Sequence, residues 1–350
     1  MLTFSANEIK DVYAKLQDDE SRSIFNSRLA YFLDGDEEHL WKIVDRLYLS
    51  YSTEIIRECN ALRNSGKKIV FYGAGVMGGV VKNCLARLGF SADFFIDKSK
   101  KKQCSGYLGL PVLSLQQLKE KHPDAAVIVT ASKVYAREIK HELISSGFNC
   151  IFDDLNKYVC ESNYFIHDFL APQSNETFID CGTLDGESIL DFIKFSNGVQ
   201  KIYGFEPDAA SYSRTKSNLE NNGLNCVEMV NKGVWGSTTE LGFVMKGDGG
   251  SHLSSSCTIK VPVTTIDETV KNENITFIKM DIEGAELEAL RGASSTIRRC
   301  KPRLAICAYH KPEDMLELPL YIQSIVPEYG YFLRHCSFNT AGSVLYAILK

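Results

Sequence analysis

The chain has 350 residues and a formal net charge of −5, and 44% of its residues are hydrophobic against 24% charged. This length allows two domains, each with a core of its own. No apolar run approaches the roughly 20 residues that a membrane helix requires. The clustered Lys and Arg that a nucleic-acid surface requires are also missing. We therefore expect no membrane span and no nucleic-acid partner.

The N-terminal residues and the cysteines indicate where the protein resides. The first residues show no basic segment followed by an apolar one, which a signal peptide would need. The eleven cysteines form no C-x-x-C pair, a distribution typical of reduced, structural thiols and not of a disulfide framework or a zinc site. We expect a cytoplasmic protein.

Residues 1–65 have apolar positions at helical spacing, and we expect a helical N-terminal region there. Residues 66–155 continue with an apolar run, a glycine loop and a helical segment in KKIVFYGAGVMGGVVKNCLARLGF. Two further apolar runs follow in ADFFIDKS and AAVIVTAS. This alternation predicts an α/β domain with a parallel sheet between helices.

Residues 156–350 repeat the alternation of strands and helices. The predicted strands are TFIDCG, KIYGFEPD, NCVEMVNKGVW, TFIKMDIEG and RLAICAYH. The runs YGYFLRHC and SVLYAILK, joined by FNTAG, predict an antiparallel hairpin at the end of the domain. The segment GDGGSHLSSS is too rich in glycine and serine for regular structure, and is either a flexible hairpin tip or a loop that closes over a ligand.

The stretch FIDCGTLDGES has the features of a ligand loop. Asp180 ends a predicted strand, and Gly182 and Gly186 allow the backbone to approach a ligand closely. A helix that starts near Glu187 would present free N–H groups to a carboxylate, so a zwitterionic amino-acid moiety would suit the loop. Glu206, in YGFEPD, ends the next strand, where an acid commonly accepts hydrogen bonds from ribose hydroxyls. Either acid alone is better explained as a helix cap or a solvated residue, but the two together favour a ligand site.

Four stretches together resemble the FkbM-type S-adenosylmethionine-dependent methyltransferases: FIDCGTLDGES, YGFEPD, FIKMDIEGAELEALRGA and PRLAICAYHKPEDMLELP. The resemblance covers roughly residues 170–350 and implies a class I, seven-stranded, Rossmann-like methyltransferase domain that binds S-adenosyl-L-methionine. The donor contacts that it implies are Asp180, Gly182, Thr183, Gly186, Glu206, Pro207, Asp208 and Asp281. The chain departs from the pattern at Thr183 and Asp185, because many methyltransferases carry a third glycine in this turn.

A hydroxyl that accepts a methyl group must lose its proton, and the candidates for this step lie in DIEGAE and AYH. Asp281 and Glu283 point to one side if the extended geometry of the strand persists. His310 ends the next strand and could serve as the base. Asp281, Glu283, Glu286 and His310 could instead hold a divalent metal ion, which is possible but not expected. A further alternative is that Glu283 and Glu286 only cap the helix.

The first glycine loop, YGAGVMGG, matches the dinucleotide pattern G-x-G-x-x-G at Gly73, Gly75 and Gly78, with Asp97 about twenty residues further on. Residues of roughly 66–150 are similar to the Rossmann-like N-terminal domain of bacterial sugar O-acyltransferases. This resemblance implies a nucleotide-diphosphate sugar as ligand, with its phosphates against the loop. A domain that binds nothing and only supports the catalytic one is the alternative.

These interpretations predict an S-adenosylmethionine-dependent O-methyltransferase that acts on a sugar or nucleotide-linked sugar in bacterial glycan biosynthesis. Residues 66–155 would present the acceptor, and the helical N-terminal region would cap the domain or pair the subunits of a homo-oligomer. Two alternatives stay open. One is a nucleotide-sugar-binding scaffold without catalysis, and the other is an NAD-dependent oxidoreductase that uses the first glycine loop.

Overall fold

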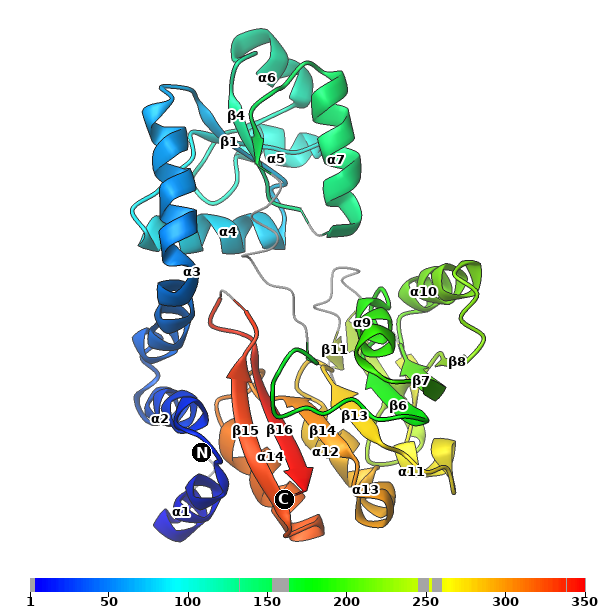
Figure 1. Cartoon of the computed structure of the whole chain (residues 1–350). Helices are drawn as coiled ribbons and strands as arrows, with labels where there is room; N and C mark the ends of the chain where they lie inside the picture. The colour runs from blue at the N-terminus through cyan, green and yellow to red at the C-terminus, as the bar shows by residue number, and fades with distance from the viewer. Residues whose placement is uncertain are drawn as a thin grey trace. The chain divides into compact units, whose positions relative to one another are not determined.

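A computed structural model of the chain describes residues 4–131, 133–152, 164–244, 252–253, 260–337 and 339–349. The chain forms two compact units (Figure 1). The first unit comprises Met1–Leu40, Asn163–Cys336 and Ala341–Lys350, and the second comprises Trp41–Ser162 and Ser337–Thr340. Among the helices described, none combines the length and the apolar character needed to cross a membrane.

The N-terminal helices are α1 (Ala6–Lys15), α2 (Asp19–Asp34) and α3 (Glu38–Asn64). The structure divides the helical region predicted over residues 1–65 between the two units. α2 belongs to the first unit, where Asp18 at its N-terminus forms an ion pair with Arg334 at 2.6 Å. The end of α3 belongs to the second unit, because Leu62 is buried in the core of that unit.

The second unit contains a five-stranded sheet in the order β3-β2-β1-β4-β5, and all four strand pairs are parallel. Its strands are β1 (Ile69–Tyr72), β2 (Phe94–Ile96), β3 (Val112–Leu113), β4 (Ala126–Val129) and β5 (Ile151–Phe152). Its helices are α4 (Val76–Arg87), α5 (Lys100–Ser105), α6 (Leu115–Lys121) and α7 (Lys133–Ser145). The central strands β1 and β4 are buried along their whole length, as continuous apolar runs in parallel sheets are. The predicted parallel sheet is confirmed.

The first unit contains a seven-stranded sheet in the order β15-β16-β14-β13-β6-β7-β8. Its strands are β6 (Glu176–Cys181), β7 (Val199–Phe205), β8 (Val227–Val230), β13 (Phe277–Met280), β14 (Arg303–Cys307), β15 (Tyr329–His335) and β16 (Ser343–Leu349). The five neighbouring strands β14, β13, β6, β7 and β8 pair in parallel. β16 is antiparallel to both β14 and β15. The predicted C-terminal hairpin is therefore confirmed.

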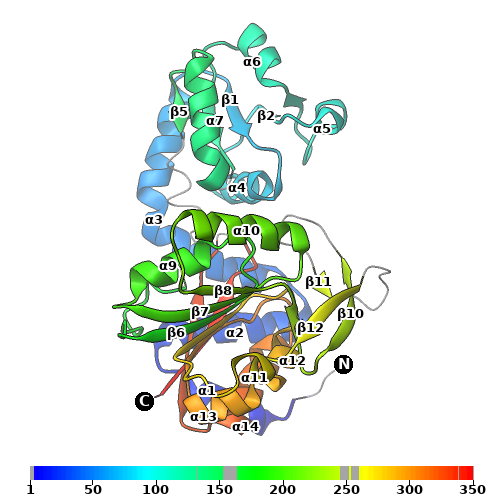
Figure 2. The same ribbon diagram turned by 90° about the vertical axis from the view of Figure 1, so that its right-hand side faces the viewer.

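Helices cover both faces of this sheet. They are α9 (Glu187–Phe195), α10 (Ala209–Asn221), α11 (Ile266–Val270), α12 (Glu286–Arg291), α13 (Ser294–Cys300) and α14 (Asp314–Ile325). Figure 2 shows α9 and α10 on one face and α12, α13 and α14 on the other. The sheet is thus the middle layer of three, which is the architecture that alternating strands and helices predict.

The stretch NCVEMVNKGVW is not one strand, as the sequence suggested, but two. It forms β8 and then β9 (Gly233–Val234), which belongs to a second sheet with β10 (Thr239–Val244), β11 (His252–Leu253) and β12 (Lys260–Thr264) in the order β11-β10-β12-β9. The chain turns between β8 and β9, where Lys232 N–H donates to the Val230 carbonyl and the Asn231 amide donates to the Glu206 carbonyl. Of the GDGGSHLSSS segment, only residues 252–253 lie within the described part of the chain.

Aromatic rings anchor α9 against β6. Phe192 of α9 stacks on Phe178 of β6 with ring centroids 4.1 Å apart, and both rings are fully buried. Phe165 and Phe277 pack edge-on against the same two rings. Because α9 is held at this depth, the loop between β6 and α9 is fixed at both ends.

The β6–α9 loop packs tightly against the end of β13. Gly182 has a φ of +84°, and a Cβ placed on it would lie 2.1 Å from the Asp281 carbonyl oxygen. No side chain fits in that space, because real Cβ atoms do not approach oxygen so closely. Gly182 therefore allows the ends of β6 and β13 to come together.

The variant Gly182→Ala tests this close approach, with Gly223→Ala as the matched control. Both glycines have positive φ values, +84° and +72°, so alanine costs about 1–2 kcal/mol of backbone strain at either position. At Gly223, however, nothing lies within 4 Å of the added Cβ. We expect Gly182→Ala to lower the free energy of unfolding by about 1–3 kcal/mol more than Gly223→Ala does, as measured by urea denaturation. Equal losses would contradict the close packing.

Candidate active site

The residues predicted as a donor and catalytic site lie at the carboxyl ends of four neighbouring parallel strands, β14, β13, β6 and β7. Asp180 belongs to β6, while Glu206, Asp281 and His310 follow β7, β13 and β14. The carboxyl ends of parallel strands meet at one edge of the sheet, where ligands bind in open α/β folds. The structure therefore places these four predicted residues along the same edge.

Glu206 holds the glycine loop between β6 and α9 through a hydrogen bond. One oxygen of this buried carboxylate accepts the Leu184 backbone N–H at 3.0 Å, and the other accepts the Asp208 N–H at 2.9 Å. Burial raises the pKa of Glu206 against the opposing effect of these two hydrogen bonds. Each carboxylate oxygen can accept a second hydrogen bond, so Glu206 can support the loop and still receive a ligand hydroxyl.

The other predicted residues of this region have different roles in the structure. Gly186, with a φ of +85°, is the N-cap of α9 and makes no side-chain cap bond, but the Glu187 N–H donates to the Asp185 carboxylate at 3.2 Å. Asp208 caps α10, because one of its oxygens accepts the Ala210 and Ser211 N–H groups at 2.9 Å each. Pro207 lies between the two acids. Thr183 is buried, and its hydroxyl has no hydrogen-bond partner among the described residues.

Asp180 faces the protein interior instead of the ligand side. It is fully buried, and its carboxylate forms an ion pair with Lys279 of β13 at 2.9 Å. Its second oxygen accepts the Ser188 hydroxyl of α9. Burial raises the pKa of Asp180, and Lys279 opposes this effect. The structure therefore gives Asp180 a supporting role behind the loop, where the sequence predicted a direct donor contact.

Asp281 accepts hydrogen bonds from two tyrosines. The hydroxyls of Tyr164 and Tyr309 each donate to one of its oxygens at 2.9 Å. Burial would raise the pKa of Asp281, but Lys279, His310 and the two phenols outweigh burial and lower the pKa. An acid with a lowered pKa is a weak base, so Asp281 is better suited to orient a partner than to remove a proton.

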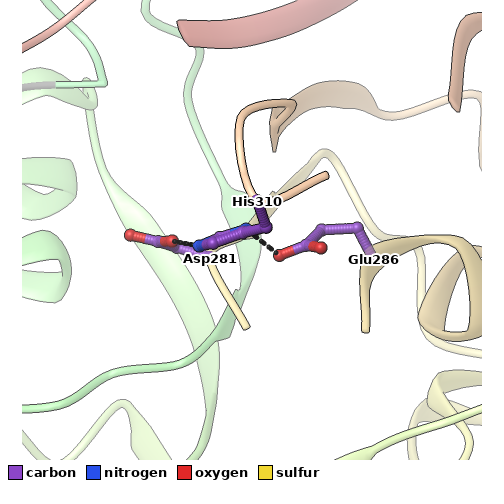
Figure 3. Close-up of side chains that lie close together, drawn as sticks. All are labelled: Asp281, Glu286 and His310. Carbon is purple, nitrogen blue, oxygen red and sulfur yellow. Dashed lines mark ion pairs between the residues drawn. The ribbon is translucent and has the colours of Figure 1, made fainter. Parts of the chain in front are cut away.

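His310 lies between two carboxylates (Figure 3). Its Nδ1 is 3.0 Å from a Glu286 oxygen, and its Nε2 is 3.5 Å from Asp281 and 3.9 Å from Glu283. Burial would lower the pKa of His310, but these three carboxylates raise it to about 9. The imidazole therefore carries a proton at neutral pH, with Glu286 fixing one nitrogen and the other nitrogen facing Asp281.

Glu283 lies near His310, but its backbone conformation differs from the predicted one. β13 ends at Met280, and Glu283 has a φ of +56°, so the extended geometry that would align it with Asp281 does not persist. Glu286 is almost fully buried, and its carboxylate accepts the Ile282 N–H at 2.9 Å as well as facing the imidazole. Glu286 therefore supports the turn before α12 and also positions His310.

Asp281, Glu286 and His310 have ligand atoms within 4.8 Å of one another, which is close enough to hold a metal ion. The imidazole, however, meets Glu286 through Nδ1 and Asp281 through Nε2. A metal ion bound to either nitrogen would therefore have only one of these two carboxylates on its own side of the ring (Figure 3). On the Nε2 side, however, Glu283 lies 3.9 Å from the imidazole beside Asp281, so the metal alternative stays a prediction.

Lys279, Tyr164 and Tyr309 were not identified from the sequence. A signal for Lys279 was present, because a lysine inside the apolar run FIKM is unusual. In the structure its register partner in β6 is Asp180. The tyrosines have no such signal, because hydrogen bonds from aromatic residues across the fold leave no local pattern.

The first glycine loop lies in the second unit, and the structure brings its predicted residues together. Gly73 has a φ of +120°, and a Cβ on Gly78 would lie 1.9 Å from the Gly73 carbonyl oxygen, so the turn and the start of α4 pack closely. Asp97 accepts the Ala74 N–H at 3.0 Å and lies 3.4 Å from the Lys102 ammonium. Asp97 therefore supports the first glycine loop, as Glu206 supports the loop between β6 and α9.

Gly75, the N-cap of α4, also makes no side-chain cap bond. Its carbonyl accepts the Tyr107 hydroxyl at 2.8 Å, and the Lys102 ammonium donates to the Ala74 carbonyl at 2.6 Å. These contacts place a cation beside the loop and fix its carbonyls.

Two protein-family models match the chain. The methyltransferase FkbM domain matches residues 180–333, and the C-methyltransferase C-terminal domain matches residues 47–147. No curated protein matches the chain. The second match covers much of the region compared above with sugar O-acyltransferases, and that resemblance stays a prediction.

Several solved structures are similar to the chain. A methyltransferase FkbM from Methylobacillus flagellatus has 22% identity, covering 89% of this chain and 100% of its own, with a TM-score of 0.48. An rRNA methylase from Streptococcus thermophilus has 15% identity, covering 51% and 89%, with a TM-score of 0.35. A SAM-dependent methyltransferase from Aquifex aeolicus has 14% identity, covering 61% and 98%, with a TM-score of 0.34.

The family match falls on the residues that build the site. The segment of residues 180–333 begins at Asp180, contains the glycine loop, Glu206 and the Asp281–Glu286 turn, and includes His310. The resemblance seen in the sequence is confirmed: this part of the chain is a methyltransferase domain of the FkbM family.

Proposed function

We propose that the protein is an S-adenosylmethionine-dependent O-methyltransferase whose first unit has the class I methyltransferase fold. The proposal depends on one observation: the glycine loop, Glu206, Asp281 and His310 all lie at the same edge of the seven-stranded sheet. The sheet supports the fold assignment, because five parallel strands are completed by an antiparallel hairpin at one edge. β6 lies between β7 and β13, where the strand order reverses, and this is the expected place for a nucleoside ligand.

The residues of the β6–β7 edge fit the donor. The Glu187 N–H at the start of α9 is taken by Asp185, and the next N–H groups and the positive dipole end of the helix would face the donor carboxylate. Glu206 offers carboxylate oxygens for the ribose hydroxyls. When bound, S-adenosylmethionine supplies a methyl group already activated by its sulfonium centre.

The residues of the β13–β14 edge then have one chemical task, which is to align an acceptor oxygen and take its proton. His310 is the candidate base, with Glu286 fixing Nδ1 while Nε2 lies 3.5 Å from Asp281. The carboxylates of Glu286, Asp281 and Glu283 raise the pKa of His310 to about 9, so the imidazole must lose its proton before it can act as a base. We therefore expect methyl transfer to increase as the pH rises from 7 towards 9.

We propose a sugar or nucleotide-linked sugar as the acceptor, in glycan biosynthesis in the bacterial cytoplasm. The glycine loop of the second unit, with Lys102 beside it, would hold the phosphates of such an acceptor.

C-methyl transfer is a second candidate, favoured by the C-methyltransferase match over residues 47–147. The same His310 could remove a proton from carbon next to a carbonyl group. The NAD alternative stays open, because Asp97, like Glu206, can support its loop and still accept a ligand hydroxyl.

Donor binding tests the proposal directly. We expect calorimetry to show S-adenosylmethionine binding to the wild-type protein, and Glu206→Gln to weaken it about 10- to 100-fold, as expected for a lost charge-assisted hydrogen bond. Glu228→Gln, on the neighbouring strand β8, is the matched control because its carboxylate pairs with Lys201 at the protein surface. A protein that binds no donor would instead be the non-catalytic scaffold. Equal affinities of the two variants would remove Glu206 from the donor site.

The acceptor is identified by incubating the protein with the donor and a panel of nucleotide sugars. We expect mass spectrometry to show one added methyl group on one class of sugar, and fragmentation to place it on oxygen. A methyl group on carbon would establish the second candidate. Activity on none of the panel, with donor binding intact, would contradict the proposed acceptor class.

The protonation of His310 can be measured without an acceptor. Its NMR signals should titrate near pH 9 in the wild-type protein. Glu286→Gln removes a negative charge 3.0 Å from Nδ1, so the pKa of His310 should fall and the base should become available at lower pH. The signals are assigned by their loss in His310→Asn. A wild-type midpoint near the ordinary histidine value of about 6.5 would contradict this electrostatic account.

A further inference from the structure

Lys279 is a buried lysine at the centre of the first unit. It lies in β13 with its side chain 3% exposed, and burial of a lysine is rare unless its charge is compensated. Its ammonium is 2.9 Å from Asp180, and one further carboxyl group, that of Asp281, and two backbone oxygens lie around the same position. None of the catalytic steps above uses this residue.

We infer that Lys279 is a positioning residue that sets the shape of the donor loop, and through it the affinity for S-adenosylmethionine. This inference rests on the proposed function. The Lys279 ammonium donates to the Gly182 carbonyl at 2.8 Å and lies 3.4 Å from the Cys181 carbonyl, so it holds the first peptide groups of the loop directly.

The direction of the Gly182 carbonyl explains why this contact matters for the ligand. Because the Lys279 ammonium is buried, the carbonyl that it binds points into the protein. If this peptide group turned over, its oxygen would face the ligand side and repel the carboxylate of the donor. Gly182 has a φ of +84° and no side chain to resist such a rotation, so hydrogen bonds must fix this peptide: Lys279 binds its carbonyl, and its N–H, on Thr183, donates to the Phe205 carbonyl at 3.3 Å.

The same ammonium fixes the other end of the loop through Asp180. One Asp180 oxygen pairs with Lys279, and the other accepts the Ser188 hydroxyl in the first turn of α9. A continuous chain of contacts therefore runs from β13 through β6 to the start of α9. The Lys279 charge thus adds to the aromatic packing of α9 and to the Phe205 hydrogen bonds at both ends of the seven-residue segment Gly182–Ser188.

The surroundings keep this charge in place. Asp180 and Asp281 raise the pKa of Lys279 against the effect of burial, and the ammonium lies 5.3 Å above the ring of Tyr164. Without Lys279, Asp180 would remain as a buried carboxylate with no cation beside it, and would take up a proton. Removing the lysine therefore disturbs Asp180 and the loop together.

The test compares donor affinity and thermal stability in Lys279→Met and Lys201→Met. Lys201 lies on β7 in the same sheet and pairs with Glu228, but it is about one-third exposed and contacts no part of the donor loop in the interactions described. We expect Lys279→Met to weaken S-adenosylmethionine binding at least 10-fold by calorimetry, and Lys201→Met to leave it unchanged. A double variant, Lys279→Met with Asp180→Asn, should bind no more weakly than Lys279→Met alone, because the two residues act as one unit.

Each outcome of this experiment decides the inference. Wild-type protein that fails to bind the donor refutes the proposed function itself. Wild-type binding with unchanged affinity in Lys279→Met overturns the inference alone. If Lys279→Met does not fold, Ser188→Ala removes only the far end of the chain of contacts, and its affinity should fall several-fold with the melting temperature close to that of the wild type. Unchanged affinity in Ser188→Ala would then overturn the inference.

Discussion

The site depends on how closely the end of β6 approaches the end of β13. The two strands are parallel neighbours with Asp180 opposite Lys279 in register, so their loops leave the sheet side by side. Gly182 lacks the Cβ that would otherwise meet the Asp281 carbonyl oxygen. This contact brings a loop suited to a donor next to a group of residues suited to an acceptor, and methyl transfer requires that proximity.

The acids of the site differ in what surrounds them, and so in what they can do. Asp180 is neutralised by Lys279 and serves the structure of the loop. Asp281 receives two phenol hydroxyls and is held as an anion, whereas burial raises the pKa of Glu206. The negative charges of the neighbouring carboxylates raise the pKa of His310, so its imidazole holds a proton. Similar side chains at the ends of neighbouring strands are therefore given separate tasks by their local partners.

Much of the fold could be predicted from the sequence, because strand periodicity, glycine loops and the closing hairpin are local signals. The prediction was less accurate where one residue or one turn decides the result. NCVEMVNKGVW reads as one strand, yet the turn at Asn231 sends its second half into another sheet. The helical residues 1–65 read as one region, yet Asp18 ties their first part to Arg334, far along the chain.

In the site, too, local sequence patterns predict the positions of residues but not the contacts between residues far apart in the chain. The positions of Glu206, Asp281 and His310 at the sheet edge could be predicted because each follows a strand with a recognisable pattern. The hydrogen bond from Tyr164 to Asp281 joins residues 117 positions apart, and the sequence contains no trace of it. The interior role of Asp180 depends likewise on Lys279, a partner in a different strand.

A crystal structure of the protein with S-adenosylhomocysteine bound would test the central claim most directly. The account predicts the nucleoside at the edge of the seven-stranded sheet, with its carboxylate at the Gly182–Gly186 loop and its ribose hydroxyls on Glu206. The same ligand found at the Gly73–Gly78 loop of the second unit, or bound without contact to Glu206, would contradict it.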